Sequence, residues 1–182
     1  MKLTAALFAF LFLNLFINSY AQQSFPDTWE GNYKGDLMIY GVDSVKMQIE
    51  MELKIKKTSN DSISDWTIIY HTKDKNDVRA YSLLLVDKQK GHYKIDEKNS
   101  IMLDVYLHNN LILTSFFEVM ESTIIITYKK VDNNILFELI ASKPEPVSKT
   151  GNTKFNDEDI PEVLSFKVNG RQKAILKKLT NN

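Results

Sequence analysis

The sequence predicts an all-β protein whose strands form an antiparallel up-and-down meander barrel of about 8 to 10 strands. Three observations support this fold class. Apolar and polar residues alternate along most of the chain, short polar turn clusters separate the alternating segments, and no segment of about ten or more residues has a helical period. Such short turns join antiparallel neighbours, because parallel strands need a long crossover connection.

The first 21 residues have the features of a secretory signal peptide. Lys2 gives a positively charged start, an apolar stretch follows over 3–17, and small residues precede a cleavage site after Ala21. A membrane-spanning helix would need about 20 apolar residues, which is more than this stretch provides. We therefore predict a signal peptide over 1–21, a periplasmic or extracellular destination, and a single barrel domain over 22–182.

Two predicted strands open the domain. Over 44–57, six apolar side chains alternate strictly with charged side chains or Gln. The segment 29–40 alternates in the same way, and 41–43 is a short turn between the two. Because a strand has a side-chain period of two, each of these strands is expected to bury one face and leave the other in water.

Seven further segments continue this rhythm. They are 63–72, 78–87, 92–97, 101–107, 111–119, 123–131 and 135–142. Turn clusters such as 88–91, 109–110 and 132–134 separate them, and these contain Gly, Asn or Asp, which tolerate the backbone of tight turns. Strands joined in sequence order by such turns make a meander.

The alternation stops over 143–162, where two prolines are followed by polar and acidic residues. We predict a long loop there, of the kind that usually forms a functional lid or a disordered segment. After this loop, the segments 163–168 and 171–179 flank Asn169 and Gly170. Asn-Gly is a strong signal for a tight hairpin turn, so a further hairpin is expected there.

A meander of about ten strands leaves two exposed edges, which invite aggregation unless the sheet closes on itself. Closure into a barrel is therefore the expected architecture. Two alternatives remain open at this point. One is a β-sandwich, which normally needs Greek-key crossings, and the other is an open curved sheet with the loop 143–162 across its mouth.

The composition excludes several classes of function. The chain has 23 Lys plus Arg and 23 Asp plus Glu, so no basic face for nucleic acid is indicated. The absence of Cys excludes a disulfide framework, a thiolate nucleophile and a lipidated cysteine at the cleavage site. No nucleophile elbow, phosphate loop, metalloprotease helix or Ser-x-x-Lys pair occurs in a suitable context. We therefore predict that the protein is not an enzyme and has no cofactor.

Three histidines are the candidate metal ligands. His71, His92 and His108 each lie near the end of a predicted strand. They could meet at a rim of the barrel and bind a metal ion or haem. No two of them are closely spaced, and polar residues at strand ends are usually solvated, so we predict no metal site.

The segment from Thr28 to Gly35 reads Thr-Trp-Glu-Gly-Asn-Tyr-Lys-Gly, with Asp27 before it. It resembles the opening Gly-x-Trp strand of the calycins, the group of lipocalins, avidins and fatty-acid-binding proteins, although Asp27 replaces the leading glycine. Calycins are meander barrels that bind small, mostly apolar ligands. The resemblance implies that Trp29 closes one end of the barrel and packs against a basic side chain from a late strand, either Arg171 or a lysine.

The inward face of the second strand is the predicted ligand lining. Its methionines are flexible and would make a deformable apolar wall, although a packed core would have the same lining. Tyr106 would add a polar anchor if its face of the strand points inward, but the opposite face is the more apolar one, which favours an outward Tyr106. The predicted ligand-binding residues are Trp29, Tyr33, Met47, Ile49, Met51 and Tyr106.

Two functions fit these features. The first is a secreted, non-enzymatic, lipocalin-like protein that binds a small apolar or amphipathic molecule in the barrel interior. The second is an envelope protein–protein interaction module with a filled barrel and no ligand. It would bind a partner or a second copy through strands that are apolar on both faces. Such strands lie at 82–86, 111–117, 124–126 and 135–137. A large interior cavity would favour the first function, and a filled core the second.

Overall fold

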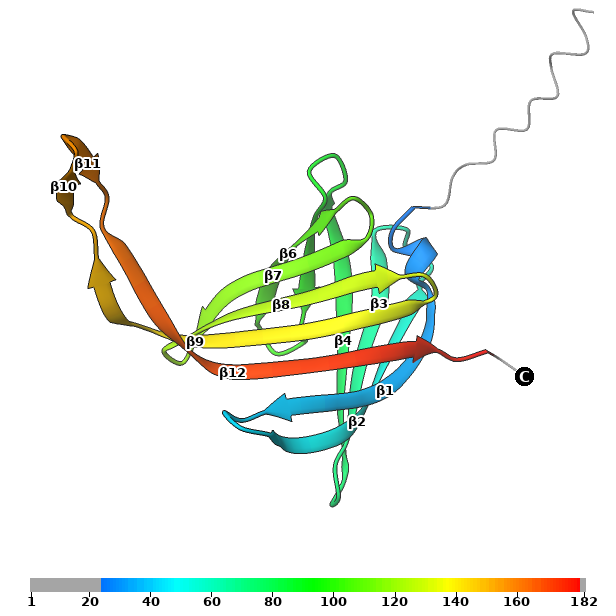
Figure 1. The fold of residues 1–182 in the computed structure, drawn as a ribbon. Coiled ribbons are helices and arrows are strands. Elements are labelled where there is room, and N and C mark those ends of the chain that lie inside the picture. Colours follow the sequence, from blue (N-terminus) through cyan, green and yellow to red (C-terminus); the bar gives the residue numbers. More distant parts are fainter. Residues whose placement is uncertain (1–23, 181–182) are drawn as a thin grey trace, which may run out of the picture.

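The computed structural model describes residues 24–180 and confirms the predicted closed antiparallel barrel, here with ten strands (Figure 1). The predicted signal peptide, 1–21, lies outside the described residues. The barrel strands are β1 (Gly31–Tyr40), β2 (Val45–Lys57), β3 (Ile63–His71), β4 (Asn76–Asp87), β5 (His92–Asp96), β6 (Met102–His108), β7 (Ile112–Val119), β8 (Ser122–Val131), β9 (Asn134–Thr150) and β12 (Val163–Lys178). A separate hairpin contains β10 (Thr153–Phe155) and β11 (Glu158–Ile160).

The strands follow chain order around most of the barrel. Each strand from β1 to β8 pairs with the next one, and β12 pairs with both β9 and β1 to close the ring. The closed order excludes the sandwich and the open sheet. Gly35 on β1 allows the close approach of β12, because a Cβ atom at this position would collide with the carbonyl oxygen of Ile175.

Strand alternation places one face of each strand in the core, as the sequence predicted. On β2, the side chains of Met51, Leu53 and Ile55 are buried, while the charged residues between them are only partly covered and point outward. Burial of such side chains stabilises each by about 1.5–3 kcal/mol relative to exposure. No helix in the described part of the chain is long and apolar enough to span a membrane.

One end of the barrel is plugged by aromatic side chains, and we call it the closed end. A single 3-10 turn, η2 (Asp27–Trp29), precedes β1 and inserts Trp29 into the core, where its indole Nε1–H donates to the carbonyl oxygen of Asn110 at 3.2 Å. Phe25 lies edge-to-face against both Trp29 and Tyr93, with ring centroids 5.0 Å apart in each pair. The plug role that the calycin resemblance implied for Trp29 is therefore the arrangement in the structure.

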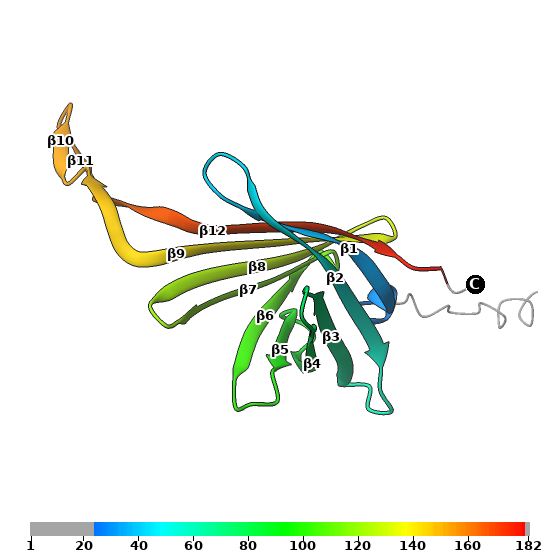
Figure 2. The same cartoon turned by 90° about the horizontal axis from the view of Figure 1, so that it is seen from below.

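The segment 143–162 differs from the long loop that the sequence predicted. Strand β9 continues to Thr150 and pairs with the start of β12, and the β10–β11 hairpin lies at the tip. We call residues 143–168 the arm, because this ribbon projects away from the barrel in both views (Figures 1 and 2). Pairing between β8 and β9 ends at Ser142, so beyond it β9 is an edge strand, where its prolines cost no ladder hydrogen bond to a second neighbour.

The hairpin predicted at Asn169 and Gly170 is also wrong. Strand β12 runs straight through both residues, with a register irregularity between Val168 and Gly170. Neither residue has the positive φ that a two-residue hairpin turn of this type requires. The tight turn lies instead at the arm tip, where Asn156 and Asp157 have φ values of 51° and 64° and connect β10 to β11.

Candidate functional site

An interior cavity of about 630 Å³ occupies the half of the barrel opposite the closed end. Its floor contains Trp66, Leu113 and Phe137, which are almost completely buried. Its rim contains Met102 and Val119, which are substantially exposed, so the cavity opens to solvent at this end. We call this opening the mouth. The cavity is therefore a one-ended pocket within the barrel.

The cavity wall is mainly apolar and comes from strands β3 to β9. Its aliphatic members include Ile68, Ile95, Leu103, Val105, Ile126 and Leu139. Tyr128 lies edge-to-face against Trp66, with ring centroids 5.2 Å apart, and the same distance separates it from the tilted ring of Phe137. Burial raises the pKa of Tyr128 above its usual value, so its hydroxyl stays neutral. These rings separate the cavity from the closed end.

A polar group of side chains stands on one side of the mouth. Arg79 donates from Nε and Nη2 to Oδ2 of Asp77, at 3.2 and 3.1 Å, and its guanidinium lies 5.0 Å from the centre of the Tyr70 ring. Burial raises the pKa of Tyr70 and of Tyr81, so both phenols remain hydrogen-bond donors at neutral pH. Glu97 completes this wall. An apolar pocket with a few polar groups at one side suits an amphipathic molecule.

None of the six residues that the sequence proposed for ligand binding lines this cavity. Trp29, Tyr33 and Met51 are completely buried in the core, and Ile49 is half-buried against it. All four belong to the barrel core, but they do not form one site, because Trp29 and Tyr33 lie near the closed end and Ile49 and Met51 lie farther along β2.

The other two proposed residues face solvent. Met47 is 54% exposed, because β2 pairs with β3 only from Glu50 onward and Met47 lies beyond this pairing. Tyr106 is 46% exposed and stacks on His92 outside the barrel, with ring centroids 4.8 Å apart. The more apolar face of β6, which includes Leu103 and Val105, points into the cavity instead.

Sequence reasoning missed the wall contributed by β4. Arg79 and Tyr81 lie on the same strand face as Leu83, which is buried, so the alternation of this strand does place them inward. A charged residue at Arg79 suggests an outward face when it is considered alone. Arg79 and Tyr81 lie four and two residues before the buried Leu83, and this even spacing could have shown that both side chains face inward.

The basic partner that the resemblance implied for Trp29 is found on a neighbouring ring. Arg171 donates to Oε1 of Glu138 at 2.7 Å rather than packing on Trp29. Two late lysines, Lys130 and Lys178, place their Nζ atoms 4.8 and 5.9 Å from the centre of the Tyr33 ring.

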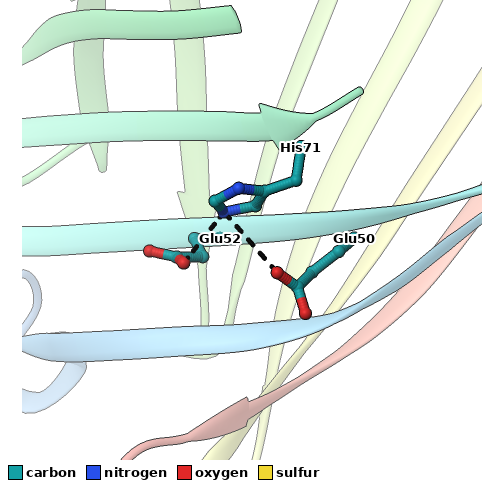
Figure 3. Close-up of side chains that lie close together, drawn as sticks. All are labelled: Glu50, Glu52 and His71. Atoms are coloured by element: carbon teal, nitrogen blue, oxygen red, sulfur yellow. Dashed lines mark hydrogen bonds and ion pairs between the residues drawn. The ribbon is translucent and has the colours of Figure 1, made fainter. Parts of the chain in front are cut away.

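The three histidines do not form a common metal site. Among residues 24–180, the one group of metal-ligating side chains that lie close together contains Glu50, Glu52 and His71 (Figure 3). His92 bonds instead to Oδ1 of Asp104 at 2.7 Å.

The Glu50, Glu52 and His71 cluster lies on the outer face of β2 and β3 (Figure 3). Nε2 of His71 is 2.9 Å from Oε1 of Glu52 and 3.7 Å from Oε1 of Glu50. Lys34 lies 2.8 Å from Glu50, and Lys54 lies 3.1 Å from Glu52. A divalent cation would have to displace both lysine contacts, so the arrangement is that of an ion-pair network.

Comparison with known proteins supports the fold. No protein-family model and no curated protein matches the chain. Among solved structures, the chain is similar to the S-type phycobiliprotein lyase CPES from Guillardia theta. The TM-score is 0.59 and the sequence identity 4%, and the match covers 88% of this chain and 96% of that one. This likeness and the closed ten-stranded barrel fit the calycin-like fold that the Trp29 segment predicted.

The same comparison corrects one prediction. The absence of catalytic motifs led us to expect a protein that is not an enzyme. The similar solved structure is described as a lyase, and this finding contradicts that expectation. A calycin-like barrel without a familiar catalytic motif is thus no ground for excluding catalysis.

Proposed function

We propose that the protein binds one small amphipathic molecule in the interior cavity, with its apolar body between the barrel walls and its polar group at the mouth. The observation that carries this proposal is the cavity itself. Its volume of about 630 Å³ lies within the range of roughly 300–1,000 Å³ that is usual for small-molecule sites. A filled barrel, which the protein-interaction alternative requires, would not leave this space.

The distribution of polar groups supports the orientation of the ligand. The floor is formed by Trp66, Leu113 and Phe137, which offer apolar surface to a hydrocarbon or ring system. The hydrogen-bonding groups of Arg79 and Tyr81 stand near the opening, where a polar head could keep contact with water. Such a molecule would gain about 25 cal/mol for each Å² of apolar surface removed from water.

Export is part of the proposal. The pattern over 1–21 is that of a secretory signal peptide, so binding would take place in the periplasm or outside the cell. The likeness to a lyase adds a further question, namely whether the bound molecule is altered. The mass of the small molecule recovered after incubation with the protein shows directly whether it has been altered.

Two neighbouring isoleucines on β8 provide a matched test. Ile126 lines the cavity, and Ile125 points outward and is partly exposed. We expect Ile126→Trp to weaken binding of a dansyl-labelled fatty acid by about tenfold or more, which is about 1.4 kcal/mol, because the indole would occupy the cavity. Ile125→Trp should leave the affinity unchanged. Equal effects of the two variants on fluorescence titrations would contradict the proposal, and circular dichroism controls for folding.

A second candidate function is self-association or partner binding through apolar surface outside the barrel. Phe116 on β7 is 69% exposed, and the arm exposes several more apolar side chains. These are Val147, Phe155, Val163, Leu164, Phe166 and Val168. Exposed apolar side chains in such numbers can mark an interaction site.

A further inference from the structure

We propose a second binding site, at the closed end of the barrel, that takes a small oxyanion such as phosphate or a carboxylate. It is independent of the interior cavity and of the function proposed above. The observation behind it is a pair of lysines, Lys130 and Lys178, that meet at one tyrosine ring without an acidic partner.

The two lysines converge on Tyr33 from different strands. Lys130 on β8 donates from Nζ to the hydroxyl oxygen of Tyr33 at 2.7 Å, and that hydroxyl donates to the carbonyl oxygen of Trp29, also at 2.7 Å. Lys178 on β12 crosses Gly31, where a Cβ atom would come within 2.6 Å of its Cε atom. The glycine therefore leaves room for the lysine stem. Burial raises the pKa of Tyr33 to about 12, so its hydroxyl is neutral and supplies no negative charge to balance either amine.

This pair stands out by its convergence on one buried tyrosine ring, because the lack of an ion pair is shared by most lysines within residues 24–180. Elsewhere in the barrel, Lys34, Lys57 and Lys98 lie 2.8, 2.7 and 2.9 Å from a carboxylate oxygen. Within residues 24–180, neither Lys130 nor Lys178 forms an ion pair with any carboxylate.

An open pocket of about 690 Å³ adjoins Lys178, while Lys130 lies outside its lining. Its lining includes Lys56 and Lys178 together with Asn32 and Asn133. Its one acidic residue, Glu30, accepts a hydrogen bond from the backbone N–H of Lys57 at 3.3 Å. With two lysines against one glutamate, the lining carries a net positive charge, which favours an anion.

This pocket and the interior cavity share no residue. One lies at the closed end, against the strand ends that carry Gly31 and Lys178, and the other opens at the mouth. An oxyanion at the closed end would therefore not compete for space with a molecule in the cavity.

The energetics of Lys130 favour an added anion. Burial and the nearby charge of Lys178 lower the pKa of Lys130 to about 8, so its protonated form is disfavoured by its surroundings. An oxyanion beside the two amines would offset both the desolvation and the mutual repulsion. Binding should then be linked to proton uptake by Lys130.

Lysine side-chain NMR at constant ionic strength tests the site on the full chain. We expect inorganic phosphate or acetate to shift the Nζ signals of Lys130 and Lys178 saturably, while chloride at equal ionic strength does not. Comparison of the phosphate and acetate titrations shows which oxyanion the site prefers. If neither anion shifts these signals more than chloride does, the proposal is overturned.

Two adjacent lysines on β12 provide the variant and its control. Lys178→Met should weaken binding of the effective anion by about tenfold, or about 1.4 kcal/mol. Lys177 neighbours Lys178 in sequence, is exposed and lies outside the pocket, so Lys177→Met should leave binding unchanged. Equal weakening by both variants would mean general charge screening and would overturn the site. If Lys178→Met does not fold, the NMR comparison of phosphate and acetate with chloride on the unmodified protein still tests whether the site exists.

Discussion

At the scale of single residues, Lys130 makes the stability of the protein depend on pH. The fold lowers its pKa from 10.5 to about 8, chiefly by burial and then by the charge on Lys178. Between these two pH values the unfolded chain holds more protons than the folded one, so the free energy of unfolding should rise with pH across this window.

We therefore expect the unmodified protein to gain more stability between pH 7.5 and about 9.5 than the Lys130→Met variant gains. Urea unfolding at both pH values measures the two gains. The upper limit matters because burial raises the pKa of Tyr33 to about 12, and this tyrosine lowers stability once the unfolded chain ionises near pH 10. Equal gains in the two proteins would show that Lys130 is not held in the disfavoured charged form.

Glu52 also makes stability rise with pH, but it does so in the acidic range, because the fold stabilises its charged form. Burial alone would raise its pKa, but hydrogen bonds from Lys54 and His71 and their charges lower it overall. The unfolded chain therefore takes up the proton first as pH falls, and the stabilising contribution of Glu52 is lost on acidification.

The expected result is a Glu52→Gln variant that is less stable by roughly 0.5–1 kcal/mol at pH 7, with the difference shrinking toward pH 3. Chemical denaturation at several pH values measures it. Glu50→Gln is the control, because Glu50 lies on the same strand face but its side chain is 41% exposed, against 15% for Glu52. A difference for Glu52→Gln that does not change with pH would contradict the ion-pair explanation.

At the scale of single elements, β2 and the arm show how far alternation can be followed. The strict alternation on β2 identified its extent and the buried face of its later part, whereas Val45 and Met47 at its start are exposed. The strands of the arm were not predicted, because two prolines and an acidic segment are typical of loops. An edge strand with a single partner nevertheless tolerates prolines and acidic residues. Which strands become edges depends on the ladder, since β8 ends its pairing with β9 at Ser142, and no local pattern reveals this.

The arm is expected to be dispensable for the barrel. Ser142 and Val168 are paired in the β9–β12 ladder, so an Asn-Gly turn can replace residues 143–167. Because an isolated two-stranded ribbon is marginally stable in water, the melting temperature should change by no more than about 2–4 °C.

Differential scanning calorimetry measures that change, and sedimentation velocity of the same variant tests the second candidate function. Removal of the exposed Phe155 and Phe166 should abolish any self-association that the arm causes. A large loss of stability would show that the arm is an integral part of the fold. Self-association that persists without the arm would contradict its role as an interaction surface.

At the scale of the whole molecule, the sequence predicted the barrel but not the position of its cavity. Closure and strand order follow from alternation and short turns, and Trp29 indicated which end is plugged. The inward-facing residues at the two ends of the barrel look alike in sequence, however. Only side-chain packing decides which end of the interior is filled. Met51 is buried in the packed core opposite Gly35 and Tyr70, whereas Leu103 and Ile126 line the cavity.

Nuclear Overhauser effects between a bound fatty acid and methyl groups of the protein test whether a small amphipathic molecule occupies the interior cavity. We expect contacts to the methyl groups of Ile68, Leu103 and Ile126, which line the cavity, and none to those of Ile125 and Ile175, which lie outside it. Contacts confined to Ile125 and Ile175, or no contacts at all under saturating ligand, would contradict this expectation.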